Sequence, residues 1–156
     1  IYLIDKYKPK AVTEVFKELR KSLGNDNFKK LFEVILTDNG WEFSKPEDIE
    51  TNKKTGEKLI NVYYCEPYSS WQKGGIERNH EFIRYIIPKG ITFDHLTKNN
   101  VIDIMNNINN VKRKSIDYNT PYLLFKNKYK KQITNSLNLK PIKDEDIDLS
   151  YKLLNK

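Results

Sequence analysis

The 156-residue sequence is poor in residues that build the commonest metal and redox sites. Its one cysteine, Cys65, allows no disulfide within the chain and excludes a zinc site made of several cysteines. Its two histidines, His80 and His95, are too few for a histidine-based metal cluster. A bound metal would therefore need carboxylate ligands, which favour a hard cation such as Mg²⁺ or Mn²⁺. The cysteine content also suits a reducing compartment, so we expect the protein in the cytoplasm.

Long hydrophobic runs are absent as well. The apolar runs last only a few residues, so no transmembrane segment is predicted. The sequence starts at Ile1 without the charged and hydrophobic regions of a secretory signal. It also lacks an initiator Met, and we expect it to be a fragment of a longer protein. Hydrophobic residues make up 38% of the chain and charged residues 31%, which predicts a globular domain rather than a disordered chain.

Positive charge is in excess. The chain has 28 Lys and Arg against 21 Asp and Glu, which gives a net charge of +7. Much of the excess lies in residues 112–131, where Asp117 is the only acid. The basic residues of this stretch are Lys112, Arg113, Lys114, Lys126, Lys128, Lys130 and Lys131. Such a stretch can follow a phosphate backbone, or it can simply be a solvated surface.

The hydrophobic pattern predicts a mixed α/β domain. Strands are expected at 1–5, 33–37 and 59–65, helices at 9–23, 28–32, 76–87, 97–113 and 120–125, and an exposed loop at 53–56. In the helix at 76–87, the residues expected to face the core are Ile76, His80, Ile83 and Ile87. Glu77, Glu81 and Arg84 then form a stripe at the border of that face. We expect a core domain of residues 1–126 and a tail of residues 127–156.

Two acids stand at the ends of predicted elements. Asp38 ends the apolar run 33–37 and precedes Asn39-Gly40, a pair that by itself favours a β-hairpin over a metal ligand. Glu77 lies in the first turn of its helix, where an acid is also ordinary because the dipole is positive there. Together, the two carboxylates could share a divalent cation that acts on a phosphodiester. The basic residues that would then bind the nucleic acid are Lys73, Arg78, Arg84 and Lys89.

The order of these motifs resembles a known family. LTDNGWEF, followed by YYCEPYSSWQKGGIERNHEFIRYIIPKG, is similar to the catalytic core of DDE transposases and retroviral-type integrases, above all to bacterial transposases of the insertion-sequence 30 family. The resemblance extends from Ile1 to Phe125. It implies metal-dependent cleavage at transposon ends and strand transfer into target DNA. The reaction would use an Asp-Asp-Glu triad and Mg²⁺, and the full-length protein would act as a homo-oligomer.

The resemblance also assigns roles to residues. Asp38 corresponds to the second acid and Glu77 to the third, while Asn39-Gly40 becomes the turn that presents Asp38. Arg84 corresponds to a basic position that faces DNA, and His80 to a position beneath the active site. The implied fold is ribonuclease H-like, with a five-stranded mixed sheet flanked by helices.

One departure from the family pattern concerns the first acid. The first helix directly follows the predicted strand 1–5, which therefore corresponds to the third strand of the fold. Strands 1 and 2, the first Asp and the helix-turn-helix are then expected upstream of Ile1. Asp5 lies on the wrong element to replace that first Asp. We therefore expect the chain alone to be inactive in strand transfer.

Two other functions remain open at this point. One is a catalytically dead remnant, or a domesticated integrase-like protein, that only binds DNA through its basic surface. The other is a structural RNA-binding protein, which would explain the charge but not the paired acids. Substituting Asp38 or Glu77 should abolish DNA cleavage in a transposase and change nothing in a protein that only binds.

Overall fold

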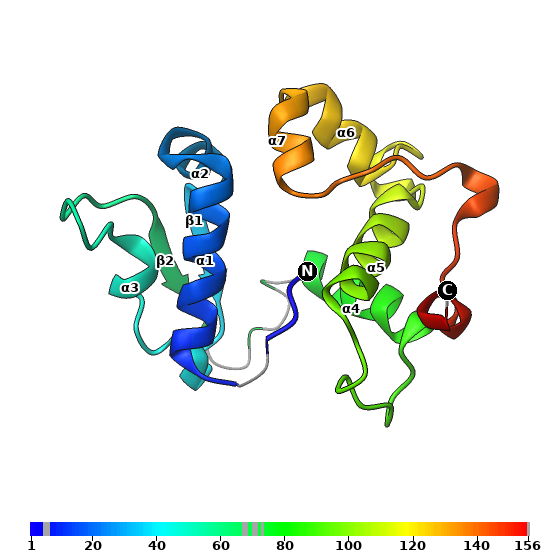
Figure 1. The fold of residues 1–156 in the computed structure, drawn as a ribbon, viewed down its shortest axis with the longest axis horizontal. Helices are drawn as coiled ribbons and strands as arrows, with labels where there is room; N and C mark the ends of the chain where they lie inside the picture. The colour runs from blue at the N-terminus through cyan, green and yellow to red at the C-terminus, as the bar shows by residue number, and fades with distance from the viewer. Residues whose placement is uncertain (5–6, 67–68, 70–71, 73, 156) are drawn as a thin grey trace. The chain divides into compact units, whose positions relative to one another are not determined.

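The structure is a computed structural model that describes residues 1–4, 7–66, 69, 72 and 74–155. It divides into two compact units (Figure 1): an N-terminal unit, Ile4–Gly74, and a C-terminal unit, Gly75–Lys156 together with Ile1–Leu3. The N-terminal unit contains α1 (Pro9–Leu23), α2 (Asn25–Leu31), β1 (Val34–Thr37), η1 (Trp41–Phe43), α3 (Glu47–Glu50) and β2 (Asn61–Tyr64). The helix α4 (Gly74–Ile86) leads into the C-terminal unit, which contains α5 (Lys98–Asn110), η3 (Lys114–Ile116), α6 (Pro121–Lys128), α7 (Lys131–Ser136), η4 (Asp144–Asp146) and η5 (Tyr151–Asn155).

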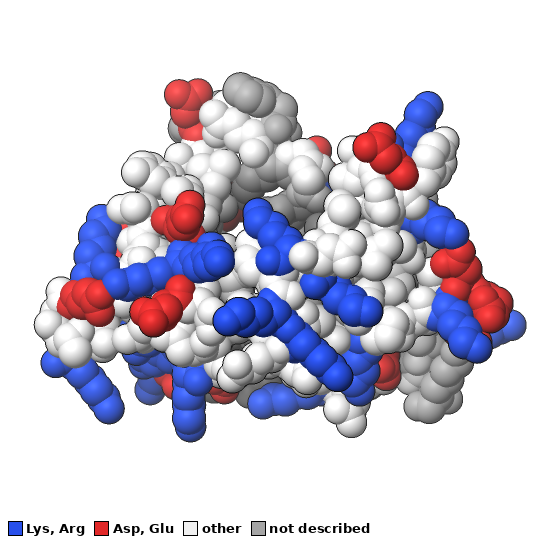
Figure 2. All heavy atoms as spheres, turned by 90° about the horizontal axis from the view of Figure 1, so that it is seen from above, with Lys and Arg blue, Asp and Glu red and all other residues white. Residues whose placement is uncertain are grey.

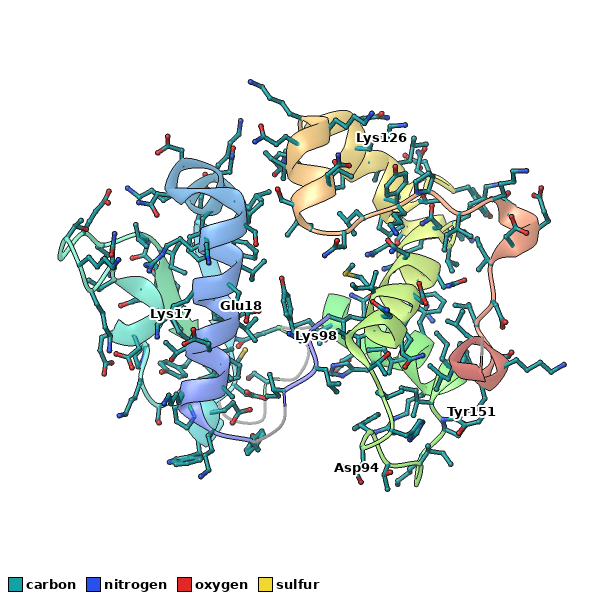
Figure 3. All side chains as sticks on the ribbon, in the orientation of Figure 1. Lys17, Glu18, Asp94, Lys98, Lys126 and Tyr151 are labelled. Carbon is teal, nitrogen blue, oxygen red and sulfur yellow. The ribbon has the colours of Figure 1, made fainter. Side chains whose placement is uncertain are left out.

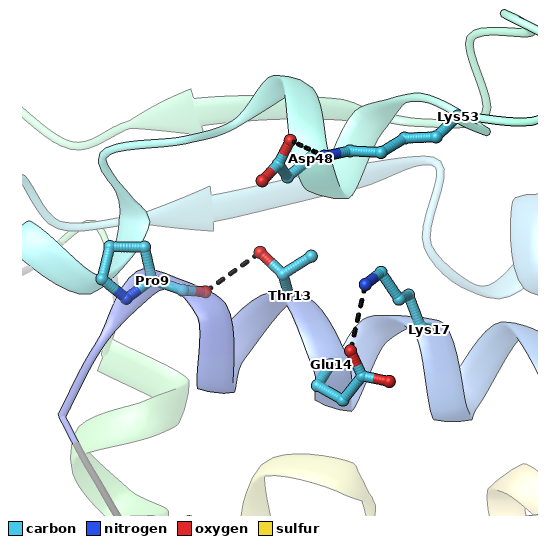
Figure 4. A network of polar contacts seen from close by, with 6 residues as sticks. All are labelled: Pro9, Thr13, Glu14, Lys17, Asp48 and Lys53. Carbon is cyan, nitrogen blue, oxygen red and sulfur yellow. Dashed lines mark hydrogen bonds and ion pairs between the residues drawn. The ribbon is translucent and has the colours of Figure 1, made fainter.

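Helix α1 has the predicted boundaries, and its ends have clear physical causes. Pro9 occupies the first turn, where its missing N–H needs no partner. The Thr13 hydroxyl donates back to the Pro9 carbonyl at 3.0 Å (Figure 4). The helix stops at Gly24, whose φ of +75° suits glycine and whose N–H bonds to the Arg20 carbonyl. Leu19 and Leu23 on its apolar face are buried.

The sheet has two parallel strands in the part of the chain described. β1 pairs with β2 from Val34↔Asn61 to Thr37↔Tyr64. A parallel pair needs a crossover connection, and here residues 38–60 provide it with η1 and α3. α3 buries Ile49 at 4% exposure, and the Val62 N–H of β2 donates to a Glu50 carboxylate oxygen of α3 at 2.8 Å. The strands predicted at 33–37 and 59–65 are thus confirmed, although each is shorter than predicted.

The strand predicted at 1–5 is wrong where it can be checked. Residues 1–4 have no regular secondary structure, and Asp5 lies outside the described residues. The amino group of Ile1 instead lies 3.6 Å from the Met105 sulfur in the C-terminal unit. A strand needs a paired neighbour to be stable, and these residues pair with neither described strand.

The C-terminal unit has a core shared by α4, α5 and the end of the chain. Ile86 and Ile87 from α4 and its C-terminal end are at most 2% exposed. Their buried neighbours are Leu96, Ile104, Ile108 and Leu153. Helix α5 begins with a capping box, because the Thr97 hydroxyl accepts from the Asn100 N–H and the Asn100 side chain accepts from the Thr97 N–H. α6 is capped at Thr120, whose hydroxyl accepts from the Leu123 N–H.

Three asparagines of α5 fasten the chain that follows α7. The Asn106 side chain donates to the Asn138 carbonyl and accepts from the Lys140 N–H, at 3.0 and 2.9 Å. Asn110 donates to the Lys140 carbonyl at 2.9 Å, and Asn107 accepts from the Asp148 N–H at 2.8 Å. All three asparagines are 3–4% exposed. The hydrophobic periodicity of this helix did not reveal them.

The described residues therefore form a mixed α/β protein with seven α-helices and a small parallel sheet. This confirms the predicted class, while the five-stranded ribonuclease H-like sheet stays a prediction. None of the helices described is long and apolar enough to cross a membrane.

Candidate active site

Asp38 directly follows β1, at the edge where two parallel strands end together. The last pair of the sheet is Thr37↔Tyr64, and beyond it the Cys65 N–H donates to the Thr37 carbonyl at 2.7 Å. The Asp38 side chain is exposed. The carboxyl ends of parallel strands are where open α/β sheets place their ligand sites. Asp38 is thus presented to solvent at a position suited to binding.

Asn39-Gly40 does not form a β-hairpin. The strand that pairs with β1 runs parallel to it, whereas a hairpin requires an antiparallel partner. Gly40 has a φ of −62°, outside the left-handed region that the favoured hairpin turns use. Asn39 instead donates its side-chain N–H to the Cys65 carbonyl at 3.3 Å, so it ties the Asp38 loop to the end of β2. This agrees with a turn that presents Asp38.

The loop that follows is fastened at two further points. The Tyr64 hydroxyl donates to the Phe43 carbonyl at 2.5 Å. The Glu42 side chain folds back over Gly40, and a Cβ added to Gly40 would lie 2.4 Å from Glu42 Oε2. The interaction with the Glu42 carboxylate is the main cause that raises the pKa of the Tyr7 hydroxyl. The charge of Asp38 raises that pKa further.

Glu77 lies in the first turn of α4 and is exposed, as predicted for an acid near a helix start. On this side of α4 there is a shallow, open depression of about 500 Å³. Its lining residues are Glu77, His80, Glu81, Arg84 and Tyr85. Glu77, Glu81 and Arg84, predicted to lie at the border of a buried face, are all exposed, and His80 beside them is exposed too. Glu81 pairs with Arg78 at 2.8 Å, three residues earlier in the helix.

The predicted core face of α4 is partly wrong. Ile83 is half-buried and Ile87 fully buried, but Ile76 is 45% exposed and His80 is exposed too. The buried cluster lies at the C-terminal end of the helix, where Leu96 and the residues of α5 provide apolar neighbours. The spacing identified the correct side of the helix, yet it could not say how far along the helix that side is covered.

The two acids fall in different units of the chain. Asp38 belongs to the N-terminal unit and Glu77 to the C-terminal unit, so the structure defines the surroundings of each acid separately. No group of three or more His, Cys, Asp or Glu that could hold a metal ion occurs among the residues described. Each acid is exposed and could contribute one carboxylate, which is the type of ligand that hard cations prefer. That they share one metal ion stays a prediction.

The predicted DNA-binding cations differ in their surroundings. Arg84 and Lys89 are exposed, Arg78 is exposed and paired with Glu81, and Lys73 lies outside the described residues. Lysine and arginine side chains alternate with acidic ones over the face seen in Figure 2. In the basic stretch, Lys126 projects from α6 (Figure 3), whereas Lys112 pairs with Asp144. Some of the basic residues are thus already engaged within the unit.

Arg113 is a member of that stretch with a structural role. Its guanidinium donates to the Asn79 side chain at 3.0 Å and lies 5.2 Å from the centre of the Phe82 ring. Burial is the main cause that lowers the pKa of Arg113, and the charge of Arg78 adds to it. Arg113 therefore joins the loop after α5 to α4. Sequence reasoning counted it as a surface charge because its partners lie more than thirty residues away.

Comparison with known proteins indicates the class of protein that this chain resembles. The chain is similar to transposases of insertion sequences, which confirms the resemblance inferred from LTDNGWEF and GGIERNHEF. No family model matches the chain, and no solved structure matches it.

Particular relatives define the similarity further. The transposase for insertion sequence element IS4351 of Bacteroides fragilis is 41% identical over 99 residues, which are 63% of this chain and 28% of the relative. The transposase InsI for element IS30A of Escherichia coli K12 is 31% identical over 115 residues, 71% of this chain and 26% of the relative. The transposase for element IS1086 of Cupriavidus metallidurans is 28% identical over 91 residues, 58% of this chain and 25% of the relative. The chain thus spans about a quarter of the length of these curated relatives.

Proposed function

We propose that this chain is part of the catalytic core of an insertion-sequence transposase, which cuts DNA at transposon ends and joins them to target DNA. One observation carries the proposal: within a sequence similar to transposases, Asp38 of the LTDNGWEF motif stands exposed at the carboxyl edge of parallel strands. Exposed acids at such an edge suit metal-dependent phosphoryl chemistry.

Asp38 and Glu77 are the residues that would hold Mg²⁺ or Mn²⁺. Both are exposed carboxylates, and hard cations prefer such oxygen ligands. When bound, the metal would lower the pKa of a coordinated water or 3′-hydroxyl and neutralise charge on the phosphate. Arg84 and Lys89, with Lys73 and Arg78, would bind the phosphate backbone of the DNA, because positive side chains replace its counterions. Asn39 and Gly40 support Asp38, and His80 shares the exposed surface of α4 with Glu77.

We further propose a ribonuclease H-like fold for the domain in which this chain takes part. The parallel pair β1–β2, with Asp38 at its end, supports this fold. The core domain would extend over residues 1–126, with residues 127–156 as a tail that the α5 asparagines hold in place. The complete protein would act as a homo-oligomer, in a compartment where DNA is accessible and thiols stay reduced, such as the cytoplasm.

The test compares the chain as printed with the product of the whole reading frame that encodes it. Asp38→Asn and Glu77→Gln are each introduced into both, and Asp94→Asn serves as the control because Asp94 is an exposed acid in a loop after α4 (Figure 3). Cleavage and joining of labelled transposon-end DNA are followed in Mg²⁺ and in Mn²⁺. DNA affinity is measured by fluorescence anisotropy at two salt concentrations.

We expect the chain by itself to cleave no DNA. In the product of the whole reading frame, both substitutions at the proposed metal ligands should reduce cleavage to background, while the control variant retains it. DNA affinity should stay within about twofold of the parent, because the phosphate contacts come from other residues. If both variants keep full cleavage, the metal-ligand assignment is wrong. If no metal-dependent cleavage occurs in any protein but salt-dependent DNA binding persists, the chain is a DNA-binding protein without transposase chemistry.

A further inference from the structure

The loop from Asp38 to Phe43 is held in an unusual way by one of its own side chains. The Glu42 carboxylate lies over the Cα of Gly40: a Cβ there would meet Oε2 at 2.4 Å, Cδ at 2.7 Å and Oε1 at 2.8 Å. Contacts below 3.0 Å cannot be accommodated unless the carboxylate or the backbone moves. Because the φ of Gly40 is −62°, its backbone would accept any residue. Glycine therefore leaves room here for the Glu42 carboxylate, and a Cβ at this position would displace that flexible side chain.

The carboxylate that fills this space is itself enclosed. Glu42 Oε2 is shielded from solvent, and no hydrogen bond to it is found within the described part of the chain. The same carboxylate interacts with the hydroxyl of Tyr7, which precedes α1. Leaving a carboxylate oxygen unpaired away from water is costly, so the rest of the loop must hold Glu42 in this position. Two hydrogen bonds do so: Tyr64 to the Phe43 carbonyl and Asn39 to the Cys65 carbonyl.

We propose that Glu42 is a positioning residue for Asp38: its side chain, packed on Gly40, fixes the loop that aims the Asp38 carboxylate at a divalent cation. This inference rests on the proposed function for the metal-binding role of Asp38. The packing of Glu42 on Gly40 does not depend on it. Residues that orient a metal ligand commonly change metal affinity by about 10- to 100-fold when they are substituted.

A double-mutant cycle tests the packing. The variants are Gly40→Ala, Glu42→Ala and the two combined, with Gly75→Ala as the matched glycine control because a Cβ at Gly75 would meet nothing within 4 Å. The loop conformation is followed by the NMR signal of the Trp41 indole N–H, since Trp41 lies between the two positions and is 60% exposed. We expect the Trp41 indole signal to shift strongly in Gly40→Ala. In the double variant, the signal should move back toward its position in Glu42→Ala. If the two substitutions act independently, Glu42 does not occupy the space at Gly40 in solution.

Metal affinity tests the positioning role. Mn²⁺ binding is measured by the enhancement of water proton relaxation for the whole reading-frame product and its variants. We expect Gly40→Ala and Glu42→Ala to weaken binding by about tenfold or more. Glu42→Gln should stay near the parent, because the amide keeps the shape of the side chain.

The conservative variant separates the possible roles of Glu42. If Glu42→Gln loses Mn²⁺ as completely as Asp38→Asn, Glu42 is a metal ligand and not a positioning residue. If the cycle shows coupling while Mn²⁺ affinity is the same in all variants except Asp38→Asn, the packing is real but does not position Asp38. If Asp38→Asn also leaves Mn²⁺ affinity unchanged, the proposed function fails at this residue, and the positioning role fails with it, whatever the cycle shows about packing.

Discussion

Both units have ion pairs at their surface, such as Lys112–Asp144 in the C-terminal unit, but they differ in whether buried amides also secure the chain. In the N-terminal unit, charged side chains at the surface join segments: Lys53 pairs with Asp48 at 2.7 Å, and Lys29 pairs with Glu57. In the C-terminal unit, buried amides hold the chain after α7 through Asn106, Asn107 and Asn110. An exposed ion pair can exchange its partner for water at little cost, whereas a buried amide that loses its partner cannot. The C-terminal unit therefore depends far more on individual polar residues.

Asn106→Ala should produce the largest effect. The substitution removes both the acceptor for the Lys140 N–H and the donor to the Asn138 carbonyl. We expect the free energy of unfolding to fall by about 2 kcal/mol, because two backbone groups lose their partners and a buried side chain is removed. Urea unfolding measures the loss, and hydrogen exchange at the Lys140 amide should accelerate with it.

The control for this prediction is Asn99→Ala, on an exposed position in the first turn of the same helix. It should change the free energy of unfolding by no more than about 0.5 kcal/mol. Equal effects of the two substitutions would mean that the α5 amides do not hold the tail, and the contrast between the units would disappear.

The buried amides also mark the limit of what the sequence could predict. Patterns within one segment gave α1 its correct ends at Pro9 and Leu23, and they located α5 and both strands. The role of Asn106 depends on residues 138–140, more than thirty positions away, and no local pattern contains that information. The same holds for Arg113 and Asn79.

In the candidate site, too, the sequence predicted the local features but not the contacts between distant segments. The motif located Asp38 at the end of a strand and Glu77 at the start of a helix, because strand ends and helix starts are local features. The parallel direction of β2, which excludes the hairpin at Asn39-Gly40, is a property of the pairing and not of either strand. The packing of Glu42 on Gly40 likewise depends on a side-chain direction that spacing does not give.

Substitution of Glu50 can show whether the contrast in stability depends on the unit in which a residue lies or on the type of contact that it makes. It lies in the N-terminal unit and carries a charge, yet it accepts from the Val62 N–H as the α5 asparagines accept from the tail. We expect Glu50→Ala to lower the free energy of unfolding by about 1 kcal/mol, because a backbone donor of β2 loses its partner.

Glu50→Gln is the informative comparison. It keeps an acceptor for the Val62 N–H and loses only the weaker pairing with Lys58, whose nitrogen lies 3.6 Å from the carboxylate. Its stability, measured by urea unfolding, should therefore stay close to that of the parent at all salt concentrations. A loss as large as that of Glu50→Ala would show that charge, and not the hydrogen bond to the backbone, is what this position provides.

Breaking the Asp48–Lys53 pair should have the smallest effect on stability, and this effect should depend on salt, unlike that of Glu50→Gln. Its lysine is 62% exposed, and the pair lies at the surface beside α1 (Figure 4). We expect Lys53→Gln to lower the free energy of unfolding by less than about 0.5 kcal/mol, and we expect added salt to remove even that difference.

The pH dependence of this pair supplies an independent measure. The hydrogen bond from Lys53 is the main cause that lowers the pKa of Asp48 below its ordinary value of 3.8. A carboxyl with a lowered pKa in the folded state contributes stability above that ordinary value, and the contribution is lost as the pH falls through the folded-state pKa. In Lys53→Gln, an NMR titration should find the pKa of Asp48 moved upward. The loss of unfolding free energy in Asn106→Ala should change little over the same range of pH and salt, because no charge takes part in it. If that loss instead followed the titration of Asp48, the buried amides would not act independently of charge, and the contrast between the two units would fail.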